Sequence, residues 1–277
     1  MTRILAIANQ KGGVGKTTTC VNLAAALAAM KRRVLLVDLD PQGNATMGSG
    51  IDKYELEQSV YDVLVDSAPL ASVVQRSPEG GYDLLPANGD LTAAEVELVG
   101  TEHKERRLAE SLTGCEGRYE FVLIDCPPSL NMLTLNGLVA ASGVLIPMQC
   151  EYYALEGLSA LVDTIQAVAR SVNPALQIEG LLRTMYDPRN SLTNEVSRQL
   201  QEHFGERVYR TVIPRNVRLA EAPSYGLPAI QYDGKSRGAQ AYLALAGELT
   251  RREQEAAVAA ESVVAAEPSM ESQNHVS

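Results

Sequence analysis

The 277-residue sequence predicts a single-domain α/β fold, in which helices cover both faces of a mostly parallel, twisted sheet. Short apolar runs alternate with helical patterns along the chain, which is typical of buried parallel strands joined by helices. A glycine-rich loop follows the first apolar run and opens the first helix. Because neither a repeat nor a linker interrupts this pattern, we expect one domain at 1–252. An acidic, alanine-rich tail at 253–277 is expected to fray from a helix end into disorder.

The first expected strand, 4–8, is apolar and leads into glycines, as a buried parallel strand does. A helix is expected at 16–30, where leucine and alanine dominate and small residues permit close packing on the sheet. Three basic residues follow near its end, where positive charge complements the helix dipole. The same reasoning predicts strands at 34–37, 121–124, 144–147 and 178–182, and helices at about 132–141, 155–171 and 191–203.

The composition is that of a soluble globular protein, with 45% hydrophobic and 21% charged residues. The sequence contains no uninterrupted apolar stretch of about 18 residues that would predict a membrane span. Its four cysteines form neither a C-x-x-C pair nor a disulfide framework, so we expect a cytoplasmic protein. The formal net charge is −10, and the five glutamates after residue 252 contribute half of it. Net charge does not locate a binding surface, so nucleic acid is not excluded as a partner.

The strongest chemical signal is the segment Lys11-Gly12-Gly13-Val14-Gly15-Lys16-Thr17-Thr18. Glycines between a strand and a helix allow backbone N–H groups to converge on an anion, and the helix dipole adds to the attraction. Lys16 is then placed to reach the β- and γ-phosphates of a nucleotide, and the Thr17 hydroxyl to ligate Mg²⁺. A turn that merely packs a helix on a strand does not require this combination. The segment therefore predicts a nucleotide phosphate site.

Three aspartates follow expected strands: Asp38 and Asp40 come after 34–37, and Asp125 comes after 121–124. In open α/β sheets, ligands bind outside the carboxyl ends of the strands. One such aspartate is a turn residue about as often as a catalytic one. Three that face one phosphate loop favour a shared Mg²⁺ site, which Thr17 would ligate directly and the three aspartates through water. Asp125 fits the aspartate that acts on the Mg²⁺ shell.

The loop departs from the ordinary phosphate-loop pattern at one position. Gln10 stands where the first glycine is required, and an additional lysine, Lys11, precedes Gly12. This is the deviant Walker A form, and with it the chain resembles the ParA/MinD superfamily of dimerising P-loop ATPases. The resemblance covers roughly 2–252 and includes the blocks 38–46, 124–130 and 151–158. A further block, 213–224, is characteristic of the ParA/Soj partitioning proteins.

The resemblance implies roles for individual residues. Lys11 would contact phosphate across a dimer interface and neutralise charge there, as an arginine finger does. Asp40 would orient or activate the attacking water, which makes Lys11, Lys16 and Asp40 the candidate catalytic residues. Pro214 and Asn216 would lie near the adenine of ATP.

The family binds double-stranded DNA without sequence preference when ATP holds it as a homodimer, which requires lysines and arginines against phosphates. Residues 183–237 contain nine basic and six acidic side chains, and Arg183 is one of the nine. Arg189 and Arg218 match positions that bind DNA in the family, and Arg215 completes the candidate patch. The alternative for each arginine is a solvated or ion-paired surface residue.

The resemblance thus implies an ATPase with slow intrinsic turnover that takes part in chromosome or plasmid partitioning on the nucleoid. A ParB/Spo0J-like, centromere-binding protein would stimulate it. The main alternative is a MinD-like positioning ATPase, which ends in a basic, membrane-binding helix, whereas this C-terminal segment is acidic. An iron–sulfur ATPase would need paired cysteines, and a repressor would need a helix-turn-helix segment; the sequence shows neither. We therefore predict DNA, and not a membrane, as the binding surface.

Overall fold

The computed structural model describes residues 2–115, 117–152 and 154–266, and one sheet runs through these ranges. Its strands are β1 (Arg3–Ile7), β2 (Val34–Asp38), β3 (Gln75–Arg76), β4 (Asp83–Leu85), β5 (Phe121–Asp125), β6 (Gly143–Gln149), β7 (Gln177–Tyr186) and β8 (Val208–Pro214). They are ordered β3-β4-β2-β5-β1-β6-β7-β8. Neighbouring strands are parallel except β3 and β4. The predicted mostly parallel α/β sheet is confirmed.

The five strands predicted from apolar runs are β1, β2, β5, β6 and β7. The sequence reasoning missed β3 and β4, which are short, and β8, in which Arg210 and Thr211 interrupt the apolar pattern. Because β8 is an edge strand, it is paired on one side only. A continuous apolar run is typical of central strands that are buried on both faces, which explains why the edges were harder to predict.

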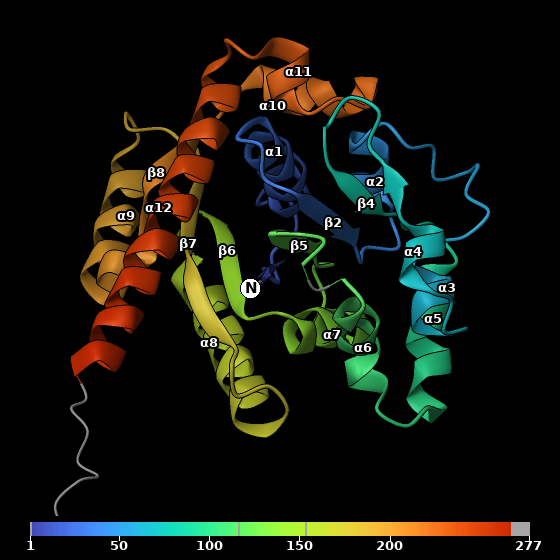
Figure 1. Cartoon of the computed structure of the whole chain (residues 1–277). Helices are drawn as coiled ribbons and strands as arrows, with labels where there is room; N and C mark the ends of the chain where they lie inside the picture. The colour runs from blue at the N-terminus through green and yellow to red at the C-terminus, as the bar shows by residue number, and fades with distance from the viewer. Residues whose placement is uncertain (1, 116, 153, 267–277) are drawn as a thin grey trace, which may run out of the picture.

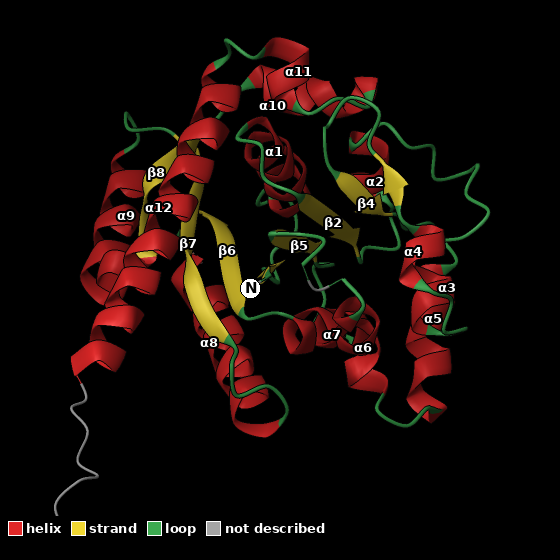
Figure 2. Ribbon diagram, viewed as in Figure 1, coloured by secondary structure: helices red, strands yellow, loops and turns green. Residues whose placement is uncertain are grey.

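Helices surround the sheet (Figure 1 and Figure 2). The α-helices are α1 (Lys16–Ala29), α2 (Asn44–Gly48), α3 (Val60–Leu64), α4 (Leu70–Val73), α5 (Leu91–Glu97), α6 (Arg107–Thr113), α7 (Met132–Ala140), α8 (Ala154–Ser171), α9 (Ser191–Phe204), α10 (Val217–Glu221), α11 (Ala229–Asp233) and α12 (Arg237–Ala266). Short 3₁₀ segments are η1 (Leu98–Gly100), η2 (Lys104–Arg106), η3 (Gly205–Arg207) and η4 (Ala222–Tyr225). The helices predicted at 16–30, 132–141, 155–171 and 191–203 are confirmed as α1, α7, α8 and α9.

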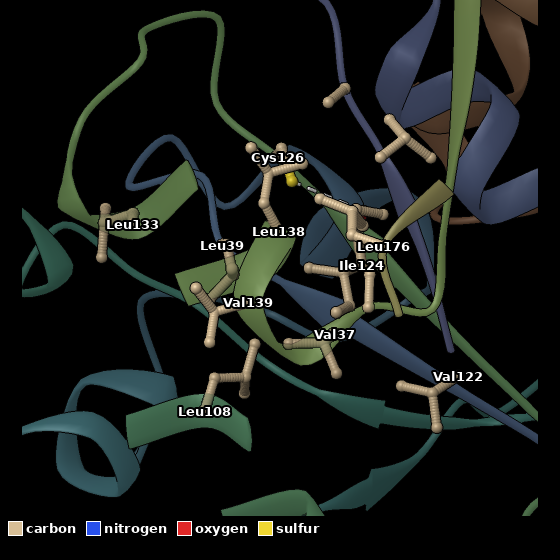
Figure 3. Packing of buried hydrophobic residues seen from close by; sticks show 14 of the residues in the cluster. Val37, Leu39, Leu108, Val122, Ile124, Cys126, Leu133, Leu138, Val139 and Leu176 are labelled. Carbon is tan, nitrogen blue, oxygen red and sulfur yellow. Dashed lines mark hydrogen bonds between the residues drawn. The ribbon is translucent and has the colours of Figure 1, made fainter. Parts of the chain in front are cut away.

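Alternate side chains of the strands enter two separate cores. Leu5 and Ile7 of β1 pack with α1 and α12, whereas Ala6 packs with the helices of the opposite face. Figure 3 shows part of this second core, in which Val122 and Ile124 of β5 lie near residues of α6 and α7. Both faces of the sheet are therefore covered, and the loops at the carboxyl ends of the strands are left to form a site.

Helix α12 continues to Ala266 and crosses the domain boundary expected at 252 without a break. Alanine and glutamate, which dominate this stretch, are strong helix formers, and Glu253 lies 3.7 Å from the Arg3 guanidinium. Residues 267–277 lie outside the described residues, so the disorder expected of the tail stays a prediction there. None of the described helices is both long and apolar enough to cross a bilayer.

Candidate nucleotide site and arginine surface

The phosphate loop and two of the predicted aspartates meet because their strands are neighbours in the sheet. Asp125, at the end of β5, is in register with Ile7 of β1 on one side and with Asp38 of β2 on the other. The loop leaves β1 and ends at Gly15, which caps the N-terminus of α1. Parallel strands that start at one edge of the sheet also finish at one edge, so the carboxylates face the loop.

The loop has the backbone conformation that its glycines were expected to provide. Gly13 and Gly15 have φ angles of 73° and 90°, in the left-handed region that favours glycine. The Lys16 side chain is buried, and its Nζ donates to the Lys11 carbonyl oxygen at 3.2 Å. Burial lowers the pKa of the Lys16 ammonium, and the nearby Asp125 and Asp40 carboxylates oppose that shift. A compact loop therefore holds a cation above the N-terminus of a helix, which is a suitable site for phosphate.

Asp125 contributes an oxygen atom that the protein leaves without a partner. Its side chain is fully buried; the Cys20 thiol donates to Oδ1 at 3.4 Å, while Oδ2 has no hydrogen-bond partner among the described residues. Burial, together with the negative charge of Asp38, raises the pKa of the Asp125 carboxyl, and the Thr17 hydroxyl and Cys20 thiol act in the opposite direction. An unpaired buried carboxylate oxygen needs an explanation, and a bound cation would supply one.

The residues present fit Mg²⁺ bound together with a nucleotide. Thr17 and Asp125 offer the oxygen atoms that Mg²⁺ prefers. The described side chains include no group of three or more His, Cys, Asp or Glu residues arranged to hold a metal ion. Phosphate oxygens would therefore have to complete the ligand set, as they do in many nucleotide sites.

Asp38 organises the loop that carries Asp40. Its Oδ2 accepts hydrogen bonds from both the backbone N–H and the hydroxyl of Thr46, each at 2.8 Å, and its Oδ1 accepts from the Asp40 N–H at 3.1 Å. Burial raises the pKa of Asp38, and these bonds oppose the shift. Asp40 itself is partly exposed and accepts a hydrogen bond from the Gln42 N–H. The observed role of Asp38 is thus to fix this loop, and its contact with a metal through water stays a prediction.

Lys11, the additional lysine, is held by its own chain in this structure. Its Nζ lies 2.6 Å from Oε2 of Glu151, which follows β6, and both side chains are about half exposed, at 47% and 50%. The Lys11 N–H also donates to the Asn9 side chain at 3.0 Å. The single chain therefore places Lys11 at the rim of the loop, and the role across a dimer interface stays a prediction.

A cavity of about 210 Å³ adjoins the phosphate loop and contains both predicted adenine residues. Pro214 and Asn216 line it, and Asn216 also caps α10 by accepting a hydrogen bond from the Leu219 N–H at 3.3 Å. The other lining residues are Gly15, Thr18, Thr184, Met185, Ile213, Arg215, Leu219, Ala220 and Tyr242. Sequence reasoning missed those from β7 and α12, since neither element carries a local motif. Only the fold brings them to the loop.

The three candidate DNA-binding arginines are exposed, and Arg215 also lines this cavity. Arg189 follows β7, Arg215 follows β8, and Arg218 lies in α10, which is seen in the upper part of Figure 1. Arg189 is 87% exposed and forms a two-pronged ion pair with Asp187, at 2.9 and 2.8 Å. These hydrogen bonds, with a contribution from the Arg215 charge, lower the pKa of Asp187 to about 2. Arg218 pairs with Glu221 at 2.8 Å and with Asp233 at 3.3 Å. We call Arg189, Arg215 and Arg218 the arginine surface.

Two arginines counted in the basic stretch do not extend this surface. Arg183 is buried, and its guanidinium donates to the Ser197 hydroxyl at 2.8 Å and to the Tyr209 carbonyl at 2.7 Å. Arg183, although it counts toward the positive balance of the stretch, therefore lies inside the fold and satisfies backbone carbonyls. Arg198 is exposed but lies between Glu195 and Glu202, which neutralise it. The charge balance of the stretch thus overstates the charge that is available to a partner.

Comparisons with known proteins identify the family. A family model described as an AAA domain matches residues 2–178. The chain is 53% identical to the sporulation initiation inhibitor protein Soj of Bacillus subtilis over 249 residues, which cover 90% of this chain and 98% of that protein. It is 54% identical to the chromosome-partitioning ATPase Soj of Thermus thermophilus over 254 residues, covering 92% of this chain and 98% of that protein.

Solved structures of related proteins share the fold. A structure described as cobyrinic acid a,c-diamide synthase of Mycobacterium smegmatis with bound ADP and magnesium superposes with a TM-score of 0.81 at 41% identity, covering 92% of this chain and 96% of that one. The cell division ATPase MinD of Pyrococcus furiosus superposes with a TM-score of 0.75 at 27% identity, covering 91% of this chain and 99% of that one. With identities above 50% to Soj proteins along nearly the whole chain, the protein belongs to the ParA/Soj family of chromosome-partitioning ATPases.

Proposed function

We propose that this partitioning ATPase binds ATP with Mg²⁺ in the phosphate loop and uses the terminal phosphate as a switch for DNA binding. One observation carries the proposal: the buried Lys16 ammonium and the buried Asp125 carboxylate are close enough to influence each other, yet Oδ2 of Asp125 has no hydrogen-bond partner among the described residues. The Lys16 ammonium is thus available for phosphate, and the free oxygen of Asp125 is available for Mg²⁺. The related Mycobacterium smegmatis structure, which holds ADP and magnesium, supports this assignment.

The residues of the chain divide the work of ATP hydrolysis. Lys16 and the loop N–H groups would bind and orient the phosphates, and Asp40 would accept a proton from the attacking water or orient that water. Asp38 holds the Asp40 N–H and thereby positions the loop from which Asp40 acts. Mg²⁺, when bound at Thr17 and Asp125, would neutralise part of the phosphate charge. We expect slow turnover, because a switch must persist in its ATP state.

We further propose that two chains close on each other around their nucleotides, with Lys11 of each chain reaching the phosphates of the other. In the single chain the Lys11 ammonium is paired with Glu151 and is about half exposed, so it would have to leave Glu151 to reach a second chain. Closure would bring two arginine surfaces together on one assembly. Because each contact with a DNA phosphate releases counterions, doubling the contacts raises affinity steeply.

Hydrolysis would then separate the chains and release the DNA. A ParB/Spo0J-like, centromere-bound protein is the proposed stimulator of this step, by analogy with the chromosome-partitioning relatives. In the cell this cycle would take place on the nucleoid. The similarity to MinD raises the alternative of a membrane-associated ATPase, and the proposal is tested most directly against it.

The test measures retention of the protein on random-sequence double-stranded DNA and on anionic liposomes, each with ATP, with ADP and without nucleotide. We expect retention on DNA that requires ATP and weakens as salt rises. Retention on liposomes in place of DNA would support the MinD-like alternative. Equal retention on DNA with ATP, with ADP and without nucleotide would contradict the proposal that the terminal phosphate controls DNA binding.

A variant with Arg189→Glu and Arg218→Glu should dimerise with ATP but lose at least about tenfold in DNA affinity, because two attractive contacts become repulsive in each chain. The matched control is Arg76→Glu with Arg118→Glu. These two arginines are also exposed and also pair with a carboxylate, Asp83, but they lie at the opposite edge of the sheet. If both variants lose DNA binding equally, net charge and not the arginine surface controls it.

A further inference from the structure

A threonine far from the phosphate loop in sequence fixes one peptide of that loop. Thr184, near the end of β7, donates from its hydroxyl to the Val14 carbonyl oxygen at 2.7 Å, and this buried hydrogen bond joins residues 170 positions apart. The Thr184 side chain is only 3% exposed, and its methyl group would lie 3.9 Å from a Cβ built on Gly15. The hydroxyl therefore holds the Val14–Gly15 peptide, and the methyl group lies where it would touch any side chain placed on Gly15.

The planarity of the peptide bond gives this contact a consequence for the loop. In a trans peptide the C=O and the following N–H point in opposite directions. Since the Val14 carbonyl points at Thr184, the Gly15 N–H points away from β7. Gly15 caps α1, so its N–H lies where the helix N-terminus and the loop present donors to an anion.

The same peptide would otherwise be easy to turn over. Glycines with positive φ stand on both sides of Val14, at Gly13 and Gly15, and glycine adopts either sign of φ at little cost. A turned peptide would direct the Val14 carbonyl oxygen toward the phosphates and repel them. Within the loop segment itself the backbone alone does not prevent this, whereas the hydroxyl of Thr184 does.

We propose that Thr184 is a positioning residue of the ATPase site, which holds the Val14–Gly15 peptide so that the Gly15 N–H is presented to the nucleotide phosphates. Thr184 acts through the loop and is distinct from the residues that contact the reacting phosphate. The proposal rests on the assignment of the loop as the ATP site. It also explains why the hydroxyl of Thr184 is buried near the end of β7, where that strand meets the phosphate loop.

The experiment compares Thr184→Val, which keeps the shape of the side chain, with Thr184→Ser, which keeps the hydroxyl. ATP binding in the presence of Mg²⁺ is measured by calorimetry well below the melting temperature of each variant. We expect Thr184→Val to bind ATP about tenfold more weakly. In this variant the conformation that binds ATP leaves the Val14 carbonyl buried without a hydrogen bond, and the free-energy cost of that corresponds to roughly a tenfold rise in Kd. Thr184→Ser should stay within about twofold of the wild type. If Thr184→Val does not fold, Thr184→Ala against Thr184→Ser isolates the hydroxyl in the same way.

Inorganic tripolyphosphate serves as a probe that has no base. Because Thr184 also lines the adenine cavity, a direct contact with the base would weaken ATP binding and leave tripolyphosphate binding unchanged. That result would overturn the proposal, as would equal ATP affinity of Thr184→Val and the wild type. An equal loss for both ligands supports it. Wild-type protein and Lys16→Ala are run alongside: failure of the wild type to bind ATP would reject the proposed function itself.

Discussion

The phosphate loop and the arginine surface each contribute lining residues, Gly15 and Arg215, to one cavity, yet the fold prepares the two regions in opposite ways. At the loop, Lys16 and Asp125 are buried, and their neighbours hold them in fixed positions. At the arginine surface, Arg189 and Arg218 are exposed and are paired with carboxylates of their own chain. The first region thus has its charged groups fixed in place within one chain, whereas the second must exchange its partners before it can bind anything.

This difference predicts how sensitive each region is to substitution. Burial makes the interactions at the loop strong and sensitive to each substitution, because unpaired groups there have no access to water. Exposed ion pairs contribute about 0–1 kcal/mol each, so they are easily exchanged for DNA phosphates. We therefore expect the largest effects of substitution at the loop, and effects at the arginine surface that depend on salt and on the assembly.

The largest expected effect is that of Lys16→Ala. Removing the buried ammonium takes away the cation that faces Asp125 and Asp40, so ATP affinity should fall at least about 100-fold, which calorimetry would measure. Lys104→Ala is the control, because it removes a partly exposed lysine, far from the loop in sequence, whose Nζ donates to the Val99 carbonyl oxygen. Unchanged ATP affinity of Lys16→Ala would remove the assignment of the phosphate loop.

Asp40→Ala should separate binding from hydrolysis. The side chain is partly exposed, and its Oδ1 accepts one hydrogen bond, from the Gln42 N–H, so its loss leaves the fold and the phosphate loop intact. We expect ATP to bind with nearly normal affinity while turnover falls about 100-fold, as the removal of a general base predicts. Phosphate release and the lifetime of the ATP-bound state on DNA measure the two halves of this prediction. Normal turnover would assign the attacking water to another group.

The central strands and the phosphate loop could be predicted because their signals are local. The apolar run of four residues at 121–124 ends at the candidate aspartate Asp125, and glycines next to Lys16 specify the loop without reference to the rest of the chain. The edge strand β8 and the length of α12 could not be predicted in the same way. Their positions depend on contacts such as the Glu248 carboxylate, which accepts hydrogen bonds from the N–H groups of Arg210 and Thr211 at 2.8 Å.

The arginine surface marks the limit of counting charges along a sequence. Arg183 and Arg189 are six residues apart, but one satisfies carbonyls inside the protein and the other is almost fully exposed. Thr184, next to Arg183, reaches the phosphate loop from β7. The twist and pairing of the strands decide whether a residue near the end of a strand faces the core, the phosphate loop or the solvent. Counting charges along the sequence does not give that information.

Asp125→Asn tests whether the buried carboxylate of Asp125 destabilises the folded protein when no nucleotide is bound. Burial raises the pKa of Asp125 to about 8, so the folded protein binds this proton more tightly than the unfolded chain. That contribution to stability is present at low pH and is lost as pH rises through about 8. At pH 9 and without nucleotide, Asp125→Asn should therefore melt about 3 °C or more above the wild type, and the difference should shrink at pH 6.

The matched variant is Asp38→Asn, which changes the neighbouring buried carboxylate. Its Oδ2 accepts two hydrogen bonds from Thr46 and its Oδ1 accepts one from Asp40, so an amide would direct N–H groups at existing donors. We expect this variant to melt below the wild type. Differential scanning calorimetry of both variants at the two pH values measures the contrast. A lower melting temperature for Asp125→Asn at pH 9 would show that the unpartnered oxygen does not strain the nucleotide-free protein.

The smallest expected effect concerns Lys11, which belongs to the loop in sequence but resembles the arginines in its exposed ion pair with Glu151. If Lys11 must leave Glu151 to reach a second chain, Glu151→Gln should lower the ATP concentration needed for dimerisation by about two- to fivefold, since an exposed pair is worth up to about 1 kcal/mol. Glu156→Gln, five residues further along, serves as the control, because it removes the same charge from an exposed position while Lys11 keeps its ion pair with Glu151. Light scattering against ATP concentration measures the midpoint. A higher midpoint for Glu151→Gln alone would mean that Glu151 supports the closed dimer, and Lys11 would then belong with the fixed residues of the loop.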